Sequence, residues 1–158
     1  MNEDLIKKYS ARITSANRGE LTSIIYDIIV EELTLAESDM KSDSEKACSE
    51  LTKARELVNE LLNTLDLQYD VSGNLARLYI YVNKCINHAL VKKSAEEIKE
   101  AVHIMSELGA AFKKIAESDD SDPLMKDTES IYAGLTYGRG MTVDEVAVRG
   151  DSDRDFRV

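Results

Sequence analysis

The chain of 158 residues contains no tryptophan, a single proline and only two cysteines. Cys48 and Cys85 form no CxxC motif, so a disulfide framework is not indicated and a reducing compartment is expected. Long apolar runs are also missing: Asp27 interrupts the best one, at residues 24–30, far short of the ~20 residues that span a bilayer. Residues 1–9 alternate charged and apolar side chains, unlike a signal peptide. These absences predict a cytoplasmic protein without membrane insertion.

Basic residues are scarce relative to acidic ones. There are 20 Lys and Arg against 30 Asp and Glu, which gives a formal net charge of −10. Such a surface repels the phosphate backbone of nucleic acids and anionic membranes, so neither is expected as a partner. Hydrophobic residues make up 43% of the chain, a balance typical of a globular protein rather than a disordered one.

Glycine and proline divide the chain into two parts. The only proline, Pro123, and four of the seven glycines follow residue 118, whereas residues 20–117 hold only Gly73 and Gly109. We therefore predict a helical domain over residues 1–117, with residues 1–16 as its N-terminal segment, and a separate tail at 118–158. The tail carries ten acidic and five basic residues, so it is an acidic, glycine-containing extension with half of the net charge.

Caps and apolar spacing predict four helices in the first part. One begins after Asn17, with Glu20 completing a capping box, and others begin near Ser42, Ser72 and Ser94. The second helix repeats apolar residues from Ala47 to Leu65 at spacings of 4, 3, 4, 3 and 4. Short connections favour antiparallel neighbours, so the expected fold is all-α, an antiparallel up-down four-helix bundle.

The third predicted helix has more apolar surface than one seam requires. Five successive apolar or aromatic residues, 78–82, surround it, and Tyr79, Ile86 and Leu90 form a second stripe beside the seam of Val71, Leu75, Leu78, Val82, Cys85 and Ala89. Two interpretations stay open. Either the helix is central and both stripes are core, or the second stripe is left for a neighbouring segment or a partner.

Candidate catalytic and metal sites are weak. Glu100 and His103 match one Glu-x-x-His element of a di-iron bundle, but the second copy is missing, because His88 follows Cys85 rather than a glutamate. Cys85 and His88 supply two ligands where a structural zinc site needs about four. No phosphate-binding glycine loop occurs either. We predict no enzyme activity, no metal, no cofactor and no small-molecule substrate.

Several segments in order resemble the flagellin export chaperones of the FliS family. Residues 9–21 followed by Ile25-Tyr26-Asp27 resemble the start of that family, residues 53–66 resemble its K-A-x-x-I-I-x-E-L-x-x-x-L-D segment, and residues 74–84 resemble its L-Y-x-Y helix. The similarity covers about residues 9–117. Four positions depart from the family pattern, where Arg18 replaces Pro, Cys85 replaces Arg, Leu90 replaces Asn and Phe112 replaces Trp.

The resemblance implies a cytosolic chaperone that binds the C-terminal helical region of flagellin, prevents premature polymerisation and delivers it to the flagellar export apparatus. A groove that hosts an amphipathic helix agrees with the apolar excess. Two alternatives remain, a helical interaction module or regulator without flagellin specificity, and a metal-dependent bundle enzyme. The hypothesised client groove consists of Leu57, Leu62, Tyr79, Tyr81, Ile86 and Leu90.

Two segments are candidates for covering apolar surface. In the resembling family the N-terminal segment can do so until the client displaces it, a role that falls here to Leu5, Ile6, Tyr9 and Ile13. The alternative is a hydrophobic staple leading into the first helix. In the tail, Tyr132, Leu135 and Tyr137 lie close together, which predicts either a docked cover or a mobile tail with incidental aromatics.

Overall fold

A computed structural model describes residues 3–118 and residue 123, except the side chains of Asp4 and Ile6. The described residues form five helices and no strand, which confirms the all-α prediction. The helices are α1 (Glu3–Ser15), α2 (Arg18–Asp39), α3 (Ser44–Asn63), α4 (Asp70–Lys92) and α5 (Glu96–Glu117). The N-terminal segment is thus a helix of its own, which the four-helix prediction left out. Within this part of the chain, no helix has the length and apolar character needed to cross a bilayer.

Local side chains explain where α2 and α3 begin. Asn17 accepts a hydrogen bond from the Glu20 amide at 2.9 Å, and the Glu20 carboxylate accepts one from the Asn17 amide at 3.2 Å. This is the predicted capping box, in which two otherwise unpaired amides are satisfied. The cap of α3 is Asp43 rather than Ser42, because the Asp43 carboxylate accepts from the Lys46 amide.

The predicted caps of the last two helices differ from the observed ones. The helix α4 begins two residues before Ser72, and neither Tyr69 nor Ala95, the residues that precede α4 and α5, makes a side-chain cap. Lys93 ends α4 in the left-handed conformation, with φ of 53°. A left-handed residue commonly reverses the chain after a helix.

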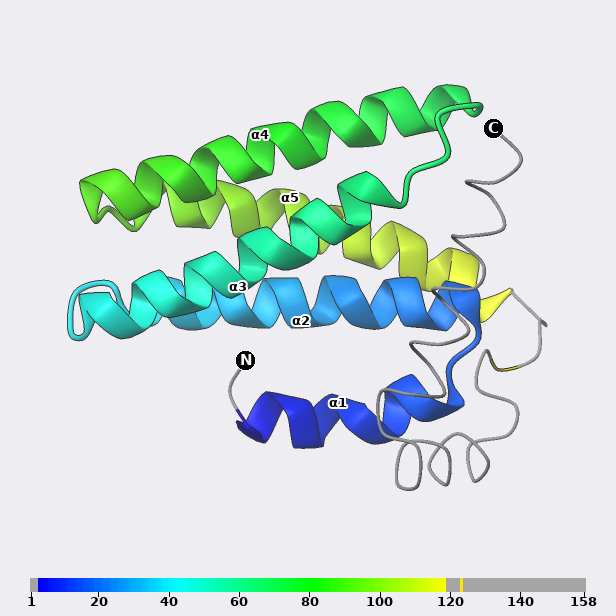
Figure 1. The fold of residues 1–158 in the computed structure, drawn as a ribbon, viewed down its shortest axis with the longest axis horizontal. Helices are drawn as coiled ribbons and strands as arrows, with labels where there is room; N and C mark the ends of the chain where they lie inside the picture. The colour runs from blue at the N-terminus through cyan, green and yellow to red at the C-terminus, as the bar shows by residue number, and fades with distance from the viewer. Residues whose placement is uncertain (1–2, 119–122, 124–158) are drawn as a thin grey trace, which may run out of the picture.

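The four longer helices pack around one main core. The helix α2 contacts both α3 and α5, and α4 contacts both α3 and α5 from the other side. Figure 1 shows the chain reversing its direction at each connection from α2 to α5, with α1 lying against the outer side of α2. The predicted seam of α3 is confirmed from Ala47 to Leu61, since Ala47, Leu51, Ala54, Val58 and Leu61 are buried. Its predicted last member, Leu65, lies beyond the end of the helix and is half-buried.

Two buried tyrosines of this core pack with the half-buried ring of Phe112. Tyr26 stacks on Phe112, with ring centroids 5.1 Å apart, and its hydroxyl forms a hydrogen bond with the Tyr79 hydroxyl. Burial raises the pKa of both tyrosines, so both hydroxyls stay protonated. Gly109 lets α5 approach this group, because a Cβ at that position would lie 3.3 Å from the Tyr26 Cβ. The paired hydroxyls satisfy two polar groups that would otherwise be costly to bury.

The structure corrects the predicted seam of α4. Leu78 is 36% exposed and Val71 is 61% exposed, whereas Tyr79 and Ile86 are buried. The apolar face that meets the core is therefore rotated away from Leu78 towards Tyr79. The reason lies outside the helix: only Tyr79 can pair its hydroxyl with Tyr26, which is 53 residues away in sequence.

Candidate protein-binding surface

The short helix α1 covers an apolar surface on α2. Leu5 and Tyr9 are each 4% exposed and pack with Ile24 and Ile28 of α2 in a cluster separate from the main core. Ala16, Ile13 and Leu21 complete this cluster near the link between the helices. We call the residues of α2 and α3 that this helix helps to cover the α1-covered surface: Ile24, Ile28, Leu35 and Leu57.

Polar contacts hold α1 in place around this cluster. The Lys8 ammonium and the Tyr9 hydroxyl both donate to the Glu31 carboxylate, at 2.7 Å and 2.8 Å. Arg12 forms an ion pair with Asp27 at 3.1 Å. Burial alone would raise the pKa of Glu31, but the hydrogen bonds from Lys8 and Tyr9 outweigh it and hold that pKa below its usual value. The two ion pairs are largely solvent-exposed, so each contributes little to stability.

A hollow of about 450 Å³ opens beside this helix. Tyr9 forms one wall, α2 contributes Val30 and Thr34, and α5 contributes Gly109 and Ala110. The floor includes Tyr26, the aromatic ring at the centre of the main core. Charged side chains also line the hollow, namely Asp27, Glu31 and Lys113. It therefore offers both apolar and charged contacts to a protein segment.

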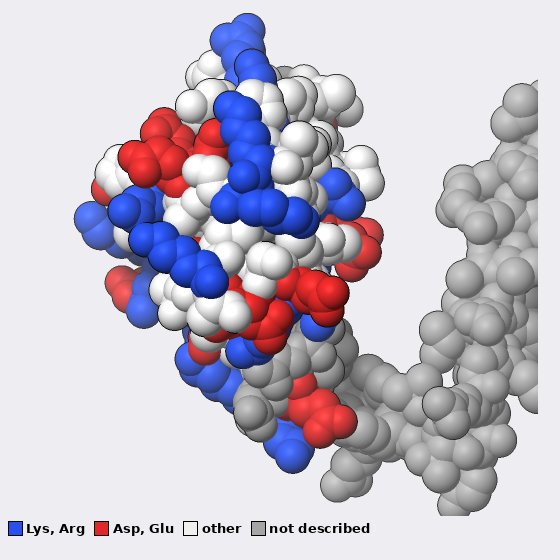
Figure 2. Space-filling view, turned by 90° about the vertical axis from the view of Figure 1, so that its left-hand side faces the viewer, with Lys and Arg blue, Asp and Glu red and all other residues white. Residues whose placement is uncertain are grey.

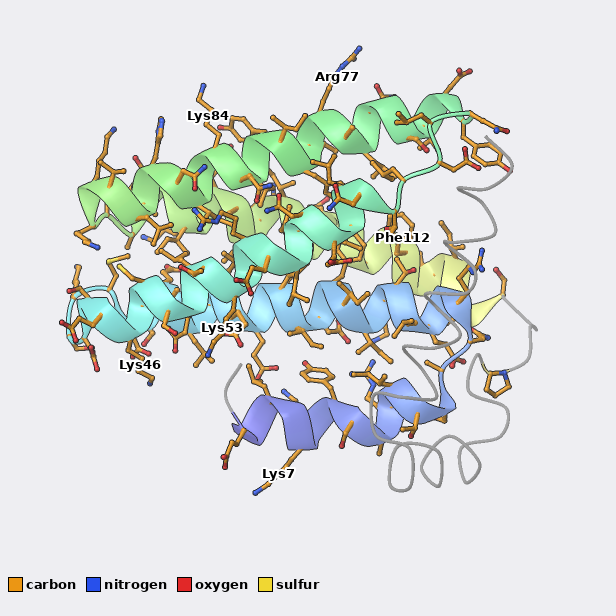
Figure 3. All side chains as sticks on the ribbon, in the orientation of Figure 1. Lys7, Lys46, Lys53, Arg77, Lys84 and Phe112 are labelled. Carbon is orange, nitrogen blue, oxygen red and sulfur yellow. The ribbon has the colours of Figure 1, made fainter. Side chains whose placement is uncertain are left out.

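Buried carboxylates lie where α2 and α3 meet. Glu32 is 1% exposed and Glu50 is 6% exposed, and both oxygens of Glu32 lack a hydrogen-bond partner among the described residues. Burial raises the pKa of Glu32, and Lys53 partly opposes the shift. Burial and the nearby charge of Asp39 raise the pKa of Glu50 to about 7, although Lys46 lies 4.0 Å away. Figure 3 shows Lys46 and Lys53 along α3.

The six residues of the hypothesised groove do not form one open surface. Tyr79 and Ile86 are 2% and 0% exposed, so the prediction that they line a groove is wrong for this structure, and the core interpretation holds for them. Leu57, Leu62 and Leu90 are half-buried and pack against the main core. Leu57 also packs against the cluster of α1.

Tyr81 lies on the other side of α4 from the contacts with α3. It is 43% exposed and its hydroxyl approaches Glu100 of α5 at 3.4 Å, whereas Asn83 and Asn87 bond to Asn59 and Arg55 of α3. The groove prediction failed because periodicity gives the spacing of a stripe but not which neighbour covers it.

The predicted N-terminal cover residues share one helix. Leu5 and Tyr9 are buried and Ile13 is half-buried, all in the cluster with α2, while the side chain of Ile6 lies outside the described residues. Their four-residue spacing was a visible signal for a helix. Tyr132, Leu135 and Tyr137 lie outside the described residues as well.

The candidate metal ligands do not come together in the structure. No group of three or more His, Cys, Asp or Glu side chains suited to a metal ion occurs in residues 3–118. Cys85 is buried, and His103 is exposed on α5.

Comparison with known proteins agrees with this geometry. The sequence profile of the family described as "Flagellar protein FliS" matches residues 1–119. The chain is also 24% identical over 111 residues to the flagellar secretion chaperone FliS of Bacillus subtilis (strain 168), a match that covers 70% of this chain and 84% of that protein. Because the profile spans α1 to α5 and most of the chain, the protein belongs to the FliS family of flagellar proteins.

Proposed function

We propose that this protein is a cytoplasmic export chaperone that binds the C-terminal helical region of flagellin. In this role it prevents premature polymerisation and delivers flagellin to the flagellar type III export apparatus. Family membership supports the chaperone role, and the relative from Bacillus subtilis is a flagellar secretion chaperone. The observation that carries the proposal is an apolar surface on α2 and α3 covered by one short helix.

The proposed mechanism is an exchange of helices. The helices α2–α5 act as the four-helix bundle of the chaperone, and α1, with only 13 residues, packs mainly on α2. A helix held through one small cluster and exposed ion pairs opens more readily than the main core. Its departure would uncover Ile24 and Ile28, and an amphipathic flagellin helix would take its place.

The proposed client contacts start from the α1-covered surface. Leu57 belongs both to this surface and to the groove predicted from sequence. Leu62, Tyr81 and Leu90 lie on other sides of α3 and α4, and we propose them as contacts for a client that wraps further around the bundle. Tyr79 and Ile86 take no part, because they are buried in the main core.

Calorimetric titration with a peptide of the flagellin C-terminal region tests this proposal. Ile28→Asp places a charge on the α1-covered surface outside the main core, and we expect at least a tenfold loss of affinity, about 1.4 kcal/mol or more. Leu57→Asp serves as a second variant. Leu5→Glu weakens the cover and should raise the affinity several-fold, because the client no longer competes with a docked α1.

The matched control is Leu67→Asp, which adds the same charge at a residue that is 76% exposed and distant from α1 in sequence. Circular dichroism checks that each variant keeps its helices. Unchanged affinity in both Ile28→Asp and Leu57→Asp would show that the client binds elsewhere. If the wild-type protein binds unrelated amphipathic peptides as tightly as flagellin, the alternative of a general helical interaction module is correct.

A further inference from the structure

The outer side of α4 carries a second regular row of residues. It repeats at spacings of 4, 3, 4, 3 and 4 on the side of the helix opposite to Val82 and Ala89, and every member is exposed. We call this row the α4 outer stripe, and it consists of Gly73, Arg77, Ile80, Lys84, Asn87 and Val91. At its edge, Asn87 also accepts a hydrogen bond from Arg55 of α3. Such spacing creates a straight seam suited to an elongated segment.

The α4 outer stripe combines exposed apolar and basic side chains. Ile80 is 57% exposed and Val91 is 82% exposed. Arg77 and Lys84 point away from the other helices in Figure 3, and neither forms an ion pair with any residue that the structure describes. Figure 2, which keeps the vertical direction of Figure 1, shows Lys and Arg side chains at the top, where α4 lies.

Charge singles out this helix within an acidic chain. The helix α4 contains Arg77, Lys84 and Lys92 against one acidic residue, Asp70, although the whole chain has a net charge of −10. A partner that matches the stripe therefore has acidic side chains next to apolar ones.

The tail of the same chain has this composition. Residues 127–137 contain Asp127 and Glu129 immediately before Ile131, Tyr132 and Leu135. The tail as a whole has ten acidic and five basic residues.

The distances allow contact between the two. The helix α5 ends at the same end of the molecule as the start of α4 (Figure 1). The 23 residues of α4 span about 35 Å at 1.5 Å per residue. A link from residue 118 to residue 131 reaches about 43–47 Å when extended. The linker is therefore long enough to bring residues 131–137 to any point of the stripe.

We propose that residues 127–137 dock on the α4 outer stripe of their own chain. The acidic side chains pair with Arg77 and Lys84, and the apolar side chains cover Ile80 and Val91. The docked tail shields an apolar, basic face from other proteins, on a different helix from the α1-covered surface. The proposal therefore does not depend on flagellin binding at the α1-covered surface.

Amide NMR spectra of the full-length protein test the proposal. A tail variant, Ile131→Ser with Tyr132→Ser and Leu135→Ser, should shift the amide signals of the α4 outer stripe and leave those of α2 unchanged. The double variant Arg77→Glu with Lys84→Glu should abolish the effect of the tail variant. Raising the salt from about 0.05 M to about 0.5 M should reproduce the shifts in the wild type, because salt screens exposed charges.

A charge-matched control and a protease assay complete the test. Lys7→Glu with Lys41→Glu makes the same charge change at two exposed lysines outside α4, and the effect of the tail variant should persist in it. Trypsin should cut after Arg139 about fivefold faster in the double variant Arg77→Glu with Lys84→Glu than in the wild type. The reason is that cleavage follows the population of molecules whose tail is undocked. Unchanged α4 signals in the tail variant would overturn the proposal. Shifts that grow with protein concentration would overturn it in favour of a second copy as the occupant.

Discussion

Replacing Glu50 by glutamine should remove a pH-dependent loss of unfolding free energy that arises where α2 and α3 meet. Glu50 is 6% exposed, and one of its oxygens has no hydrogen-bond partner among the described residues. Burial is the largest cause of its raised pKa, followed by the negative charge of Asp39, which forms an ion pair with Lys46 at 3.0 Å. Lys46 lowers the Glu50 pKa in part, and Glu32 adds a smaller increase. Ionised Glu50 is therefore unfavourable in the folded state.

The sign and size of the effect follow from two pKa values. The Glu50 pKa is about 7 in the folded protein against 4.5 for an ordinary glutamate, so the folded state binds more protons between these values. The unfolding free energy is therefore highest below about pH 4.5, falls as the pH rises, and levels off above about pH 7. At about 1.4 kcal/mol for each pKa unit, the full loss is about 3 kcal/mol. Most of this loss falls between pH 5 and pH 8.

Urea unfolding at a series of pH values measures this difference. We expect the unfolding free energy of Glu50→Gln, relative to the wild type, to rise by about 2–3 kcal/mol from pH 5 to pH 8. Burying the glutamine amide changes the unfolding free energy by the same amount at every pH, so it does not alter the expected dependence on pH. Glu56→Gln, at an exposed position on the same helix, should run parallel to the wild type. Parallel curves for Glu50→Gln would refute the argument.

Two further predictions concern the main core and the helix glycines. Tyr79→Phe should lower the unfolding free energy by ~1–3 kcal/mol, because it leaves the buried Tyr26 hydroxyl without its partner, and the double variant Tyr26→Phe with Tyr79→Phe should lose less than the sum of the single variants. Gly73→Ala should stabilise the protein by ~0.5–1 kcal/mol, since a Cβ there meets nothing within 4 Å, whereas Gly109→Leu should destabilise it by more than ~1 kcal/mol. Urea midpoints test both, and equal effects at the two glycines would contradict the packing argument.

Features that depend on local sequence could be predicted. The start of α2 depends on Asn17 and Glu20, which are three residues apart, and the core face of α3 depends on one clean seam. Both are fixed by neighbours along the chain, so caps and periodicity were sufficient. The all-helical class followed from the same patterns.

Features that depend on distant residues could not be predicted. Leu78 and Tyr79 were both plausible core residues of α4, and the choice depends on the Tyr26 hydroxyl, 53 residues away. Likewise, Leu5 and Tyr9 were predicted to cover apolar surface but not to form a helix, and the Glu31 carboxylate that accepts the hydrogen bond of the Tyr9 hydroxyl is 22 residues away. Sequence patterns place residues on a face, whereas packing decides what that face meets.

The short link between α1 and α2 makes the first helix a permanently tethered competitor. Only Ala16 and Asn17 separate the two helices, so α1 is always present near its site at an effective concentration of about millimolar or higher. In the proposed exchange of helices, a client must therefore displace a ligand that dilution cannot remove. If α1 is docked in about 99% of molecules, the apparent affinity for the client is about 100-fold weaker than the intrinsic one. Lys8 and Tyr9 hold α1 in place through Glu31. In this scheme, single substitutions of Lys8 or Tyr9 change the affinity for the client without altering the surface that the client binds.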